Sequence, residues 1–222
     1  MCANYTPGRR ERNEEHFGVD FEPLDERPEA FPGYLAPIIR RARDADEFET
    51  VNACFGMVPH WADMKLVRNT YNARTETVAE KASFRNAWKK KQFCIIPAAN
   101  FFEPCYETGK PIRWRIEHAK DRPIGIAGIW EWRPEGPDGS PLVSFSMLTI
   151  NADGHPLMQR FHKPEEEKRM VVILEPNQYH DWIAGKLIET VDDFQRYPAE
   201  QLVAMADPLP PRSKIKQLKD AA

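Results

Sequence analysis

Hydrophobic and polar residues change their spacing many times along this chain of 222 residues. Alternating or continuous apolar runs bounded by proline or glycine are typical of strands. Runs of this kind are GYLAPIIR, VNACFGMVP, QFCIIPA, IRWRIEH, PIGIAGIWEW, LVSFSMLTIN and RMVVILE. We therefore predict a strand at each of them. The proline and glycine content of RPEGPDGSP predicts a hairpin loop between two of these strands.

Polar and mixed segments separate the predicted strands. Residues 9–18 read as a short polar helix that ends at Gly18, and PNQYHDWIAG as a helix that ends at Gly185. SFRNAWKKK is a third helix, with Ser83 as its expected N-cap. Many short strands with short peripheral helices predict an α+β fold: a mixed, mainly antiparallel sheet or open barrel. Without a repeat or composition break, residues 1–222 are expected to form a single domain.

Composition narrows the class of protein. Hydrophobic residues make up 41% of the chain and charged residues 29%, as in ordinary globular proteins. No apolar run is long enough for a membrane span, and the polar N-terminus lacks the core of a secretory signal. The four cysteines form no C-x-x-C pair, so neither a metal site nor a disulfide framework is expected. We expect a monomer without a cofactor in a reducing cytoplasm, associated with the nucleoid if the source is bacterial.

Charge suggests local rather than general attraction to anions. The net charge of −3 argues against a protein coated in basic residues. The strand IRWRIEH, however, alternates apolar and basic residues and should present Arg113 and Arg115 on one face. A confined basic groove is therefore compatible with the composition.

The second residue of the chain offers unusual chemistry. If Met1 is removed, Cys2 carries a thiol and a free α-amine on adjacent carbons. Thiols titrate near pKa ~8.5 and α-amines near ~7.7–8.0, so both should be partly unprotonated in the cell. Such an aminothiol condenses with an aldehyde to a Schiff base, and the thiol then closes a thiazolidine ring. It can equally act as a hydrolytic nucleophile, or Cys2 can be an accident of the start codon.

Further segments place polar or base-like residues beside apolar sequence. They are NARTE, CIIPAANFFEP, LTINADG and MQRFHKPEEEKRMVVIL. Glu103 follows two phenylalanines, and a partly desolvated carboxyl there could move protons near neutrality. Taken singly, each residue has an ordinary interpretation: Asn72 in a turn, Glu103 in a salt bridge, His162 on the surface.

Taken together and in this order, these motifs resemble the SRAP family, the SOS-response-associated peptidases. The matching features are M-C at the start, N-A-R-x-E, P-A-x-x-F-[FY]-E, and a late histidine followed by R-M before an apolar strand. GYLAP and FGMVPHW look like two further family segments. The resemblance runs from Met1 to about Glu175.

The resemblance implies an abasic-site sensor that removes its own Met1. Cys2 would then form a covalent thiazolidine crosslink with abasic sites in single-stranded DNA. By motif position, Cys2 is the nucleophile, Asn72 holds the α-amine and the sugar, Glu103 is the acid–base residue and His162 assists sugar opening and reversal.

DNA contacts are expected from four further residues. By motif position Arg74 contacts a phosphate beside the lesion. Trp61, in the segment PHW, could stack on a flanking base, although it could equally belong to the core. Thr149 and Arg113 complete the expected DNA-binding set.

The sequence departs from the family pattern at defined places. Ala3 and Asn4 follow Cys2 where the family usually has G-R, and Pro104 follows Glu103 where tryptophan is common. The segment KPEEEK, residues 163–168, interrupts the usual H-x-R-M-P motif and adds three glutamates. Because these charges would repel phosphate, we expect residues 163–168 to loop outward.

Two other functions remain open from the sequence. One is an N-terminal-nucleophile cysteine hydrolase, similar to an amidotransferase, although such folds usually begin with a long strand directly after the nucleophile. The other is a DNA- or protein-binding module without catalysis.

Overall fold

A computed structural model describes residues 2–24, 28–42, 47–187 and 194–209. Met1 and the basic end of the tail, residues 212–216, lie outside these residues. Within them, no helix is long and apolar enough to cross a membrane.

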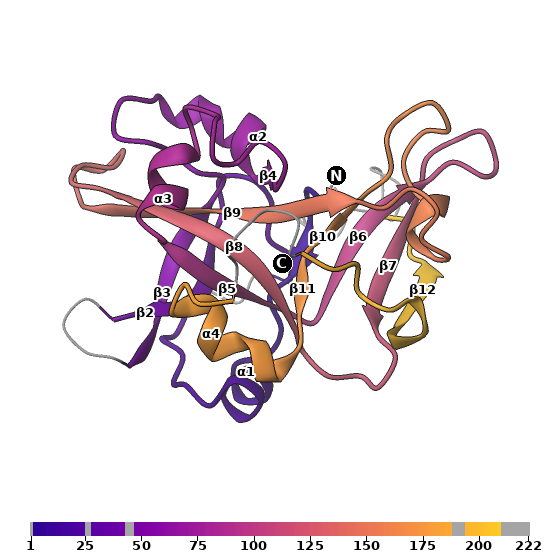
Figure 1. Cartoon of the computed structure of the whole chain (residues 1–222), viewed down its shortest axis with the longest axis horizontal. Coiled ribbons are helices and arrows are strands. Elements are labelled where there is room, and N and C mark those ends of the chain that lie inside the picture. The colour runs from indigo at the N-terminus through magenta and orange to yellow at the C-terminus, as the bar shows by residue number, and fades with distance from the viewer. Residues whose placement is uncertain (1, 25–27, 43–46, 188–193, 210–222) are drawn as a thin grey trace, which may run out of the picture.

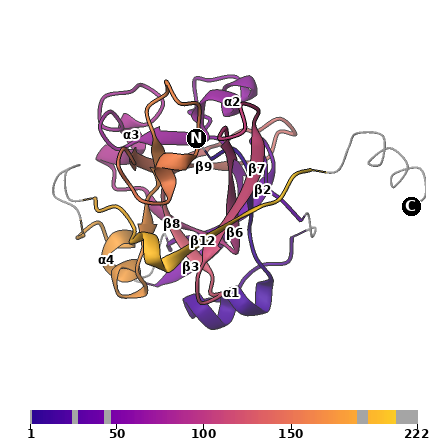
Figure 2. The same cartoon turned by 90° about the vertical axis from the view of Figure 1, so that its right-hand side faces the viewer.

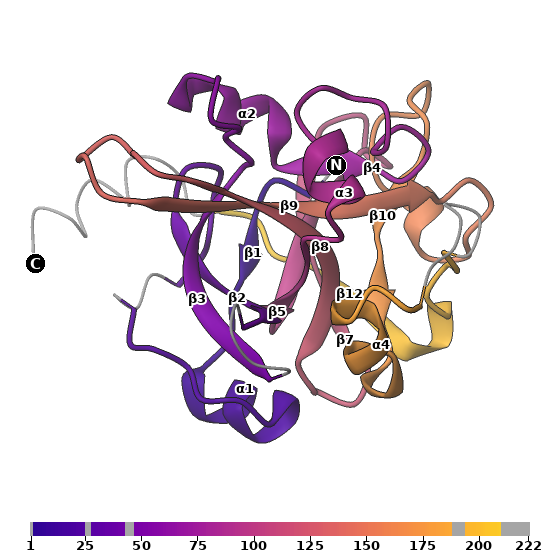
Figure 3. The same ribbon diagram turned by 60° about the vertical axis from the view of Figure 1, so that its left-hand side comes forward.

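A barrel of five strands forms the larger part of the molecule. Its strands are β2 (Leu35–Arg41), β3 (Phe48–Phe55), β5 (Phe93–Ala98), β8 (Ile124–Arg133) and β9 (Leu142–Asn151). The order is β9-β3-β2-β5-β8, and pairing of β8 with β9 closes the ring. All neighbours are antiparallel except β3 and β9. β8 and β9 form the long hairpin in Figure 3.

A smaller antiparallel sheet stands beside the barrel (Figures 1 and 2). It contains β1 (Tyr5–Thr6), β6 (Asn100–Cys105), β7 (Ile112–His118) and β12 (Leu202–Ala206), in the order β1-β6-β7-β12. One residue, Ala99, separates β5 of the barrel from β6, so the chain passes directly from one sheet into the other.

Three short strands extend the barrel sheet. β4 (Asn72–Arg74) lies parallel to β9, and β10 (Arg169–Val171) lies antiparallel to it. β11 (Ile173–Leu174) pairs with β8. Segments far apart in the sequence therefore meet around the C-terminal half of β9.

Short helices cover the outside. They are α1 (Arg10–Phe17), α2 (Val67–Thr70), α3 (Arg85–Lys89) and α4 (Tyr179–Ile183). Single 3-10 turns occur at Met64–Leu66, Met158–Arg160, Pro176–Gln178 and Ala199–Gln201.

The α+β class and the mixed, mainly antiparallel sheet are confirmed, as are the hairpin and the helix that ends at Gly18. Three details were wrong. Ser83 is not the N-cap of α3, because the helix begins one residue later, after Phe84. The run RMVVILE forms two strands rather than one. The segment PNQYHDWIAG, expected as one helix that ends at Gly185, is a 3-10 turn followed by α4, which ends at Ile183 with Ala184 as its C-cap.

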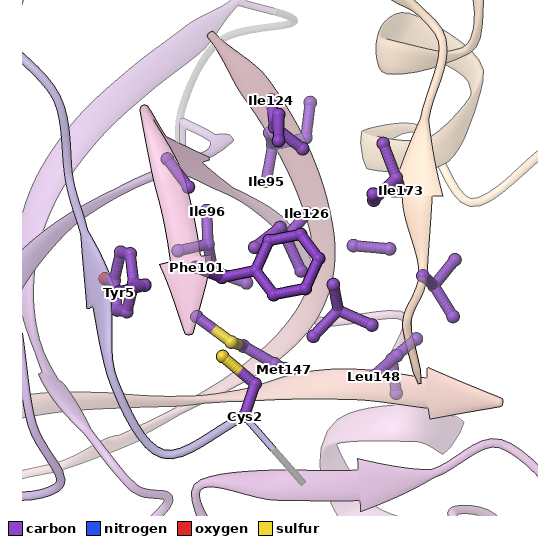
Figure 4. Packing of buried hydrophobic residues seen from close by; sticks show 14 of the residues in the cluster. Cys2, Tyr5, Ile95, Ile96, Phe101, Ile124, Ile126, Met147, Leu148 and Ile173 are labelled. Carbon is purple, nitrogen blue, oxygen red and sulfur yellow. The ribbon is translucent and has the colours of Figure 1, made fainter. Parts of the chain in front are cut away.

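The core lies inside the barrel and continues under the smaller sheet. Two stacked pairs of aromatic rings mark the buried residues: Phe55 and Phe145, with centroids 5.2 Å apart, join β3 and β9, and Phe93 and Trp182, with centroids 4.3 Å apart, lie between β5 and the covering helix α4. Each such side chain contributes about 1.5–3 kcal/mol on burial. Cys2 belongs to this core, and Figure 4 shows its side chain at the edge of a cluster that includes Phe101.

Candidate active site

The N-terminal segment is fixed against β6. Tyr5 is paired with Phe101, and the backbone N–H of Phe102 donates to the carbonyl of Asn4 over 3.0 Å. A second contact, between the backbones of Tyr5 and Ala30, holds the other edge of β1. Because β1 and β6 are antiparallel, this pairing directs the chain before Tyr5 along β6 toward Glu103, so Cys2 lies beside that part of the strand.

The thiol of Cys2 is completely buried. Its Sγ donates to the carbonyl of Asn4 over 3.4 Å. Burial, and next the nearby charge of Glu103, raise the pKa of this thiol to about 12. In the chain that retains Met1, the thiol therefore departs from the free-cysteine pKa, which applies only to a solvated side chain. The thiol is protonated at cellular pH.

Asn72 holds the backbone of Cys2. Its amide Nδ2 donates to the carbonyl oxygen of Cys2 over 2.7 Å, and both groups are buried. The side-chain oxygen Oδ1 is also buried and has no hydrogen-bond partner among the described residues. Strand β4, pinned beside β9 by the pairing of Asn72 with Met147, sets this position. An acceptor is thus available next to the atoms that carry the α-amine.

Glu103 and His162 form the second half of the site. Nε2 of His162 lies 3.0 Å from Oε2 of Glu103, at ion-pair distance, and both side chains are nearly inaccessible to solvent. Glu103 lies on β6, whereas His162 follows the turn at Met158–Arg160. The two residues are therefore brought together by tertiary structure alone.

The backbone at His162 is held in an uncommon conformation. Its φ of 63° lies in the left-handed region, which costs most non-glycine residues of order 1 kcal/mol or more. The amide of His162 donates to the carbonyl of Pro104 over 2.9 Å, and Phe161 is paired with Cys105. These contacts tie the turn to β6 and direct the imidazole toward Glu103.

Tyr71 lies near the site and was not among the residues named from the sequence. Burial raises the pKa of its hydroxyl, and the nearby charges of Glu103 and Cys2 raise it further. The only sequence feature that could have pointed to Tyr71 is its position directly before Asn72.

A group of charged residues surrounds Thr149 next to this site. The buried Arg169 donates from Nη2 to the carbonyl and the hydroxyl of Thr149. It also binds both oxygens of Glu76, over 2.7 and 2.9 Å. Thr149 is itself buried, and its expected contact with DNA stays a prediction.

The outward course expected for residues 163–168 is wrong in one respect. Residues 163–167 are exposed, but the carboxylate of Glu167 lies against two arginines beside the site. It accepts from Arg74 over 2.8 Å and from Arg169 over 2.8 Å. Two nearby guanidinium groups attract this glutamate toward the site.

The remaining candidate DNA contacts, Arg113 and Trp61, differ in how far they are engaged by other side chains. The guanidinium of Arg113 lies over the ring of Phe102, 3.5 Å from its centroid, and forms an ion pair with Glu29. Glu29 also accepts from the side-chain amide of Asn4 over 2.9 Å, so this carboxylate links Asn4 to Arg113. Trp61 is 55% exposed and so is not a core residue. Its role in stacking stays a prediction.

The described residues contain no cluster of three or more histidine, cysteine, aspartate or glutamate side chains that could hold a metal ion. The site instead combines a buried thiol, an amide with a spare acceptor and a paired carboxyl and imidazole. Once an α-amine is present at Cys2, these groups suit carbonyl chemistry: they can orient an amine and move protons in a nearly dry setting.

Comparison with known proteins adds independent observations. Residues 1–206 match the family model described as SOS response associated peptidase (SRAP). The chain is 31% identical over 163 residues to the abasic site processing protein YoqW of Bacillus subtilis strain 168, covering 67% of this chain and 68% of that protein. It is 25% identical over 195 residues to the abasic site processing protein HMCES of Xenopus tropicalis, covering 72% of this chain and 56% of HMCES.

Solved structures agree. A crystal structure of a protein from Bordetella bronchiseptica superposes with a TM-score of 0.81 at 35% identity, covering 94% of this chain and 100% of that one. A protein from Bacteroides thetaiotaomicron superposes with a TM-score of 0.77 at 22% identity, covering 97% and 94%. The second likeness supports the fold alone.

Proposed function

Because the chain belongs to the SOS response associated peptidase (SRAP) family, we propose that it processes abasic sites in single-stranded DNA by forming a covalent bond through Cys2. The observation that carries this proposal is the contact of Asn72 with Cys2 beside the buried pair of Glu103 and His162. The names of the relatives YoqW and HMCES, both abasic site processing proteins, point to the same lesion.

The reaction begins when loss of Met1 frees the α-amine of Cys2. The amine attacks the aldehyde of the ring-opened sugar, and loss of water gives a Schiff base. The thiol then adds across the carbon–nitrogen double bond: its sulfur bonds to carbon, and a proton is delivered to nitrogen. The sum is one aminothiol and one aldehyde giving one thiazolidine and one water.

Each neighbouring side chain has a defined task in this sequence. Asn72 fixes the carbonyl of Cys2 and offers Oδ1 to the α-amine, which keeps the amine aligned. Glu103 moves protons during loss of water and during attack by the thiol. A base is needed there because the pKa of the thiol is raised to about 12. His162, paired with Glu103, assists opening of the sugar and reversal.

The same buried carboxyl serves removal of Met1. Glu103 can activate the water that attacks the peptide bond between Met1 and Cys2, which makes the protein its own peptidase. Arg74 and the exposed Trp61 supply contacts to the phosphate backbone and to a flanking base.

We also propose that the protein acts as a monomer in the cytoplasm. All four candidate catalytic residues come from one chain, and the four cysteines are all free. We extend the proposed domain over the whole chain, residues 1–222.

Intact mass spectrometry tests the proposal directly. The protein is incubated with single-stranded DNA that contains one abasic site, and with the same strand without the lesion. The expected result is a single adduct of protein plus DNA minus one water, on the lesion strand only. Turnover of glutamine without an adduct would instead support the N-terminal-nucleophile hydrolase. That alternative is disfavoured by the two-residue strand β1, since α1 already begins at Arg10.

A further inference from the structure

One carboxylate joins the two arginines that flank β9. Arg74 lies on β4 at one edge of β9, and Arg169 lies on β10 at the other edge. Glu167 accepts from Arg74 at Oε2 and from Arg169 at Oε1, each over 2.8 Å. Asn151 donates to the same Oε1 over 3.2 Å. Both oxygens of Glu167 are thus used by charged or polar donors.

The carboxylate is ionised in this setting. Partial burial acts to raise the pKa of Glu167, but hydrogen bonds from Arg169 and Asn151, with the charges of Arg169 and Arg74, hold it below its usual value. The carboxylate of Glu167 therefore occupies guanidinium donors of Arg74 and Arg169 that could otherwise bind a phosphate.

The two arginines differ in how firmly they are committed. Arg169 is buried and is also bound by Glu76 and by Thr149, so it keeps partners if Glu167 leaves. The side chain of Arg74 is 49% exposed, and Glu167 is its hydrogen-bonding partner among the described residues. Arg74 is therefore the arginine that a ligand from solvent can take over.

The backbone beside Glu167 is fixed, so exchange needs only a rotation of its side chain. The amide of Lys168 donates to Asp153 over 3.0 Å, and the carbonyl of Lys168 accepts from Ala152 over 2.7 Å. The ammonium group of Lys168 closes the turn onto the carbonyl of Lys163 over 2.6 Å. Glu167 is thus held next to Arg74 whether or not the two are in contact.

We propose that Glu167 is a resident competitor for the backbone phosphate at Arg74, and that it limits the affinity of the protein for intact single-stranded DNA. The inference rests on the proposed function, because it takes Arg74 as a phosphate contact. Arg74 lies two residues after Asn72 on β4, about 7 Å along the strand from the residue that holds Cys2. A phosphate there must displace Glu167 and approach its negative charge. Intact strands are therefore released sooner than they would be without Glu167, whereas an abasic strand is retained by its covalent bond.

Glu167→Gln tests this competition, since it keeps the length of the side chain and its contact with Asn151. The probe is a fluorescein-labelled oligothymidylate without an abasic site, titrated with the full chain at low salt. We expect Glu167→Gln to bind it about 2- to 10-fold more tightly than the wild type, the range for an exposed ion pair plus relief of repulsion. Glu166→Gln is the matched control. It removes the same charge one residue away, where the glutamate is exposed and faces Lys163 at 3.7 Å.

A double-mutant cycle ties the effect to Arg74. In an Arg74→Met background, Glu167→Gln should change the affinity no more than Glu166→Gln does. Equal tightening by Glu166→Gln and Glu167→Gln, or no tightening by Glu167→Gln, would overturn the proposal. The absence of measurable binding by every variant would overturn it as well. Thermal melting of each variant confirms that the fold is retained.

The proposed function has a separate readout in the same set of proteins. Each variant is also mixed with an abasic strand, and the adduct is scored by mass. If Glu167→Gln tightens binding to oligothymidylate but no protein forms an adduct, the competition stands and the crosslinking function fails. If adducts form but Glu167→Gln leaves the affinity unchanged, the crosslinking function stands and the competition fails.

Discussion

Asn72→Ala should slow crosslinking without weakening the binding of DNA. The substitution removes the 2.7 Å hydrogen bond to the carbonyl of Cys2 and leaves that buried oxygen without its donor. Loss of one partner of a buried hydrogen bond costs about 1–3 kcal/mol. If that cost falls on the alignment of the α-amine in the transition state, the rate drops by about 5- to 150-fold.

The assay is a single-turnover experiment with protein in excess over a labelled strand that carries one abasic site. The first-order rate of adduct formation is compared for the wild type, Asn72→Ala and Asn72→Asp. Asn72→Asp preserves shape but turns a carboxylate oxygen toward the carbonyl of Cys2, so it should be at least as slow. Affinity for the intact strand should stay within about twofold, because Asn72 is buried. A folded Asn72→Ala with a rate within twofold of the wild type would refute the reasoning.

Three further predictions address the thiol, the fold and the peptidase. The pKa of the Cys2 thiol is about 12 in the folded state and 9.0 in the unfolded state, so the free energy of unfolding should fall as pH rises above about 9. Urea unfolding at several pH values should show a shallower fall for Cys2→Ala than for the wild type. Equal pH dependence of the two proteins would contradict the burial argument. Gly56→Ala should lose about 2–4 kcal/mol in the same assay, since φ is +107° and a Cβ would meet the carbonyl of Val67 at 2.6 Å. Gly139→Ala, at φ +81° in open space, should lose about 1 kcal/mol or less; equal losses would exclude a steric cause. Glu103→Gln should retain the initiator methionine by mass, and complete removal would exclude Glu103 as the peptidase base.

The larger elements could be predicted from apolar periodicity, and the shorter ones could not. The strands β8 and β9 are long runs with a hairpin between them, and the pattern alone locates them. β4 has only three residues, and it is a strand only because β9 offers a free edge. The run RMVVILE breaks at Val172, whose amide bonds to Leu148 of β9 while its carbonyl accepts from Ala127 of β8. A continuous apolar run carries no sign of that exchange of partners.

The candidate residues could be named from motif order, but the electrostatics around them could not be predicted. Motif order named Asn72, Glu103 and His162 as candidates; the structure puts Asn72 in contact with Cys2 and His162 beside Glu103, whose charge acts on the Cys2 thiol. The raised pKa of the thiol depends on burial of Cys2 against β6, which the residues around Cys2 in the sequence do not reveal. The inward turn of Glu167 depends on two arginines from different strands. Pairwise contacts of this kind exist only after folding.

Substitution of the nucleophile tests the central claim most directly. Cys2→Ser keeps an amine, but its hydroxyl closes a far less stable ring than the thiol does. The wild type, Cys2→Ser and Cys2→Ala are incubated with an abasic single strand, with and without borohydride, and run on a denaturing gel after heating. The account predicts a heat-stable crosslink for the wild type without reductant, and for Cys2→Ser only with it. A heat-stable crosslink of Cys2→Ser without reductant, equal to that of the wild type, would contradict the thiazolidine mechanism.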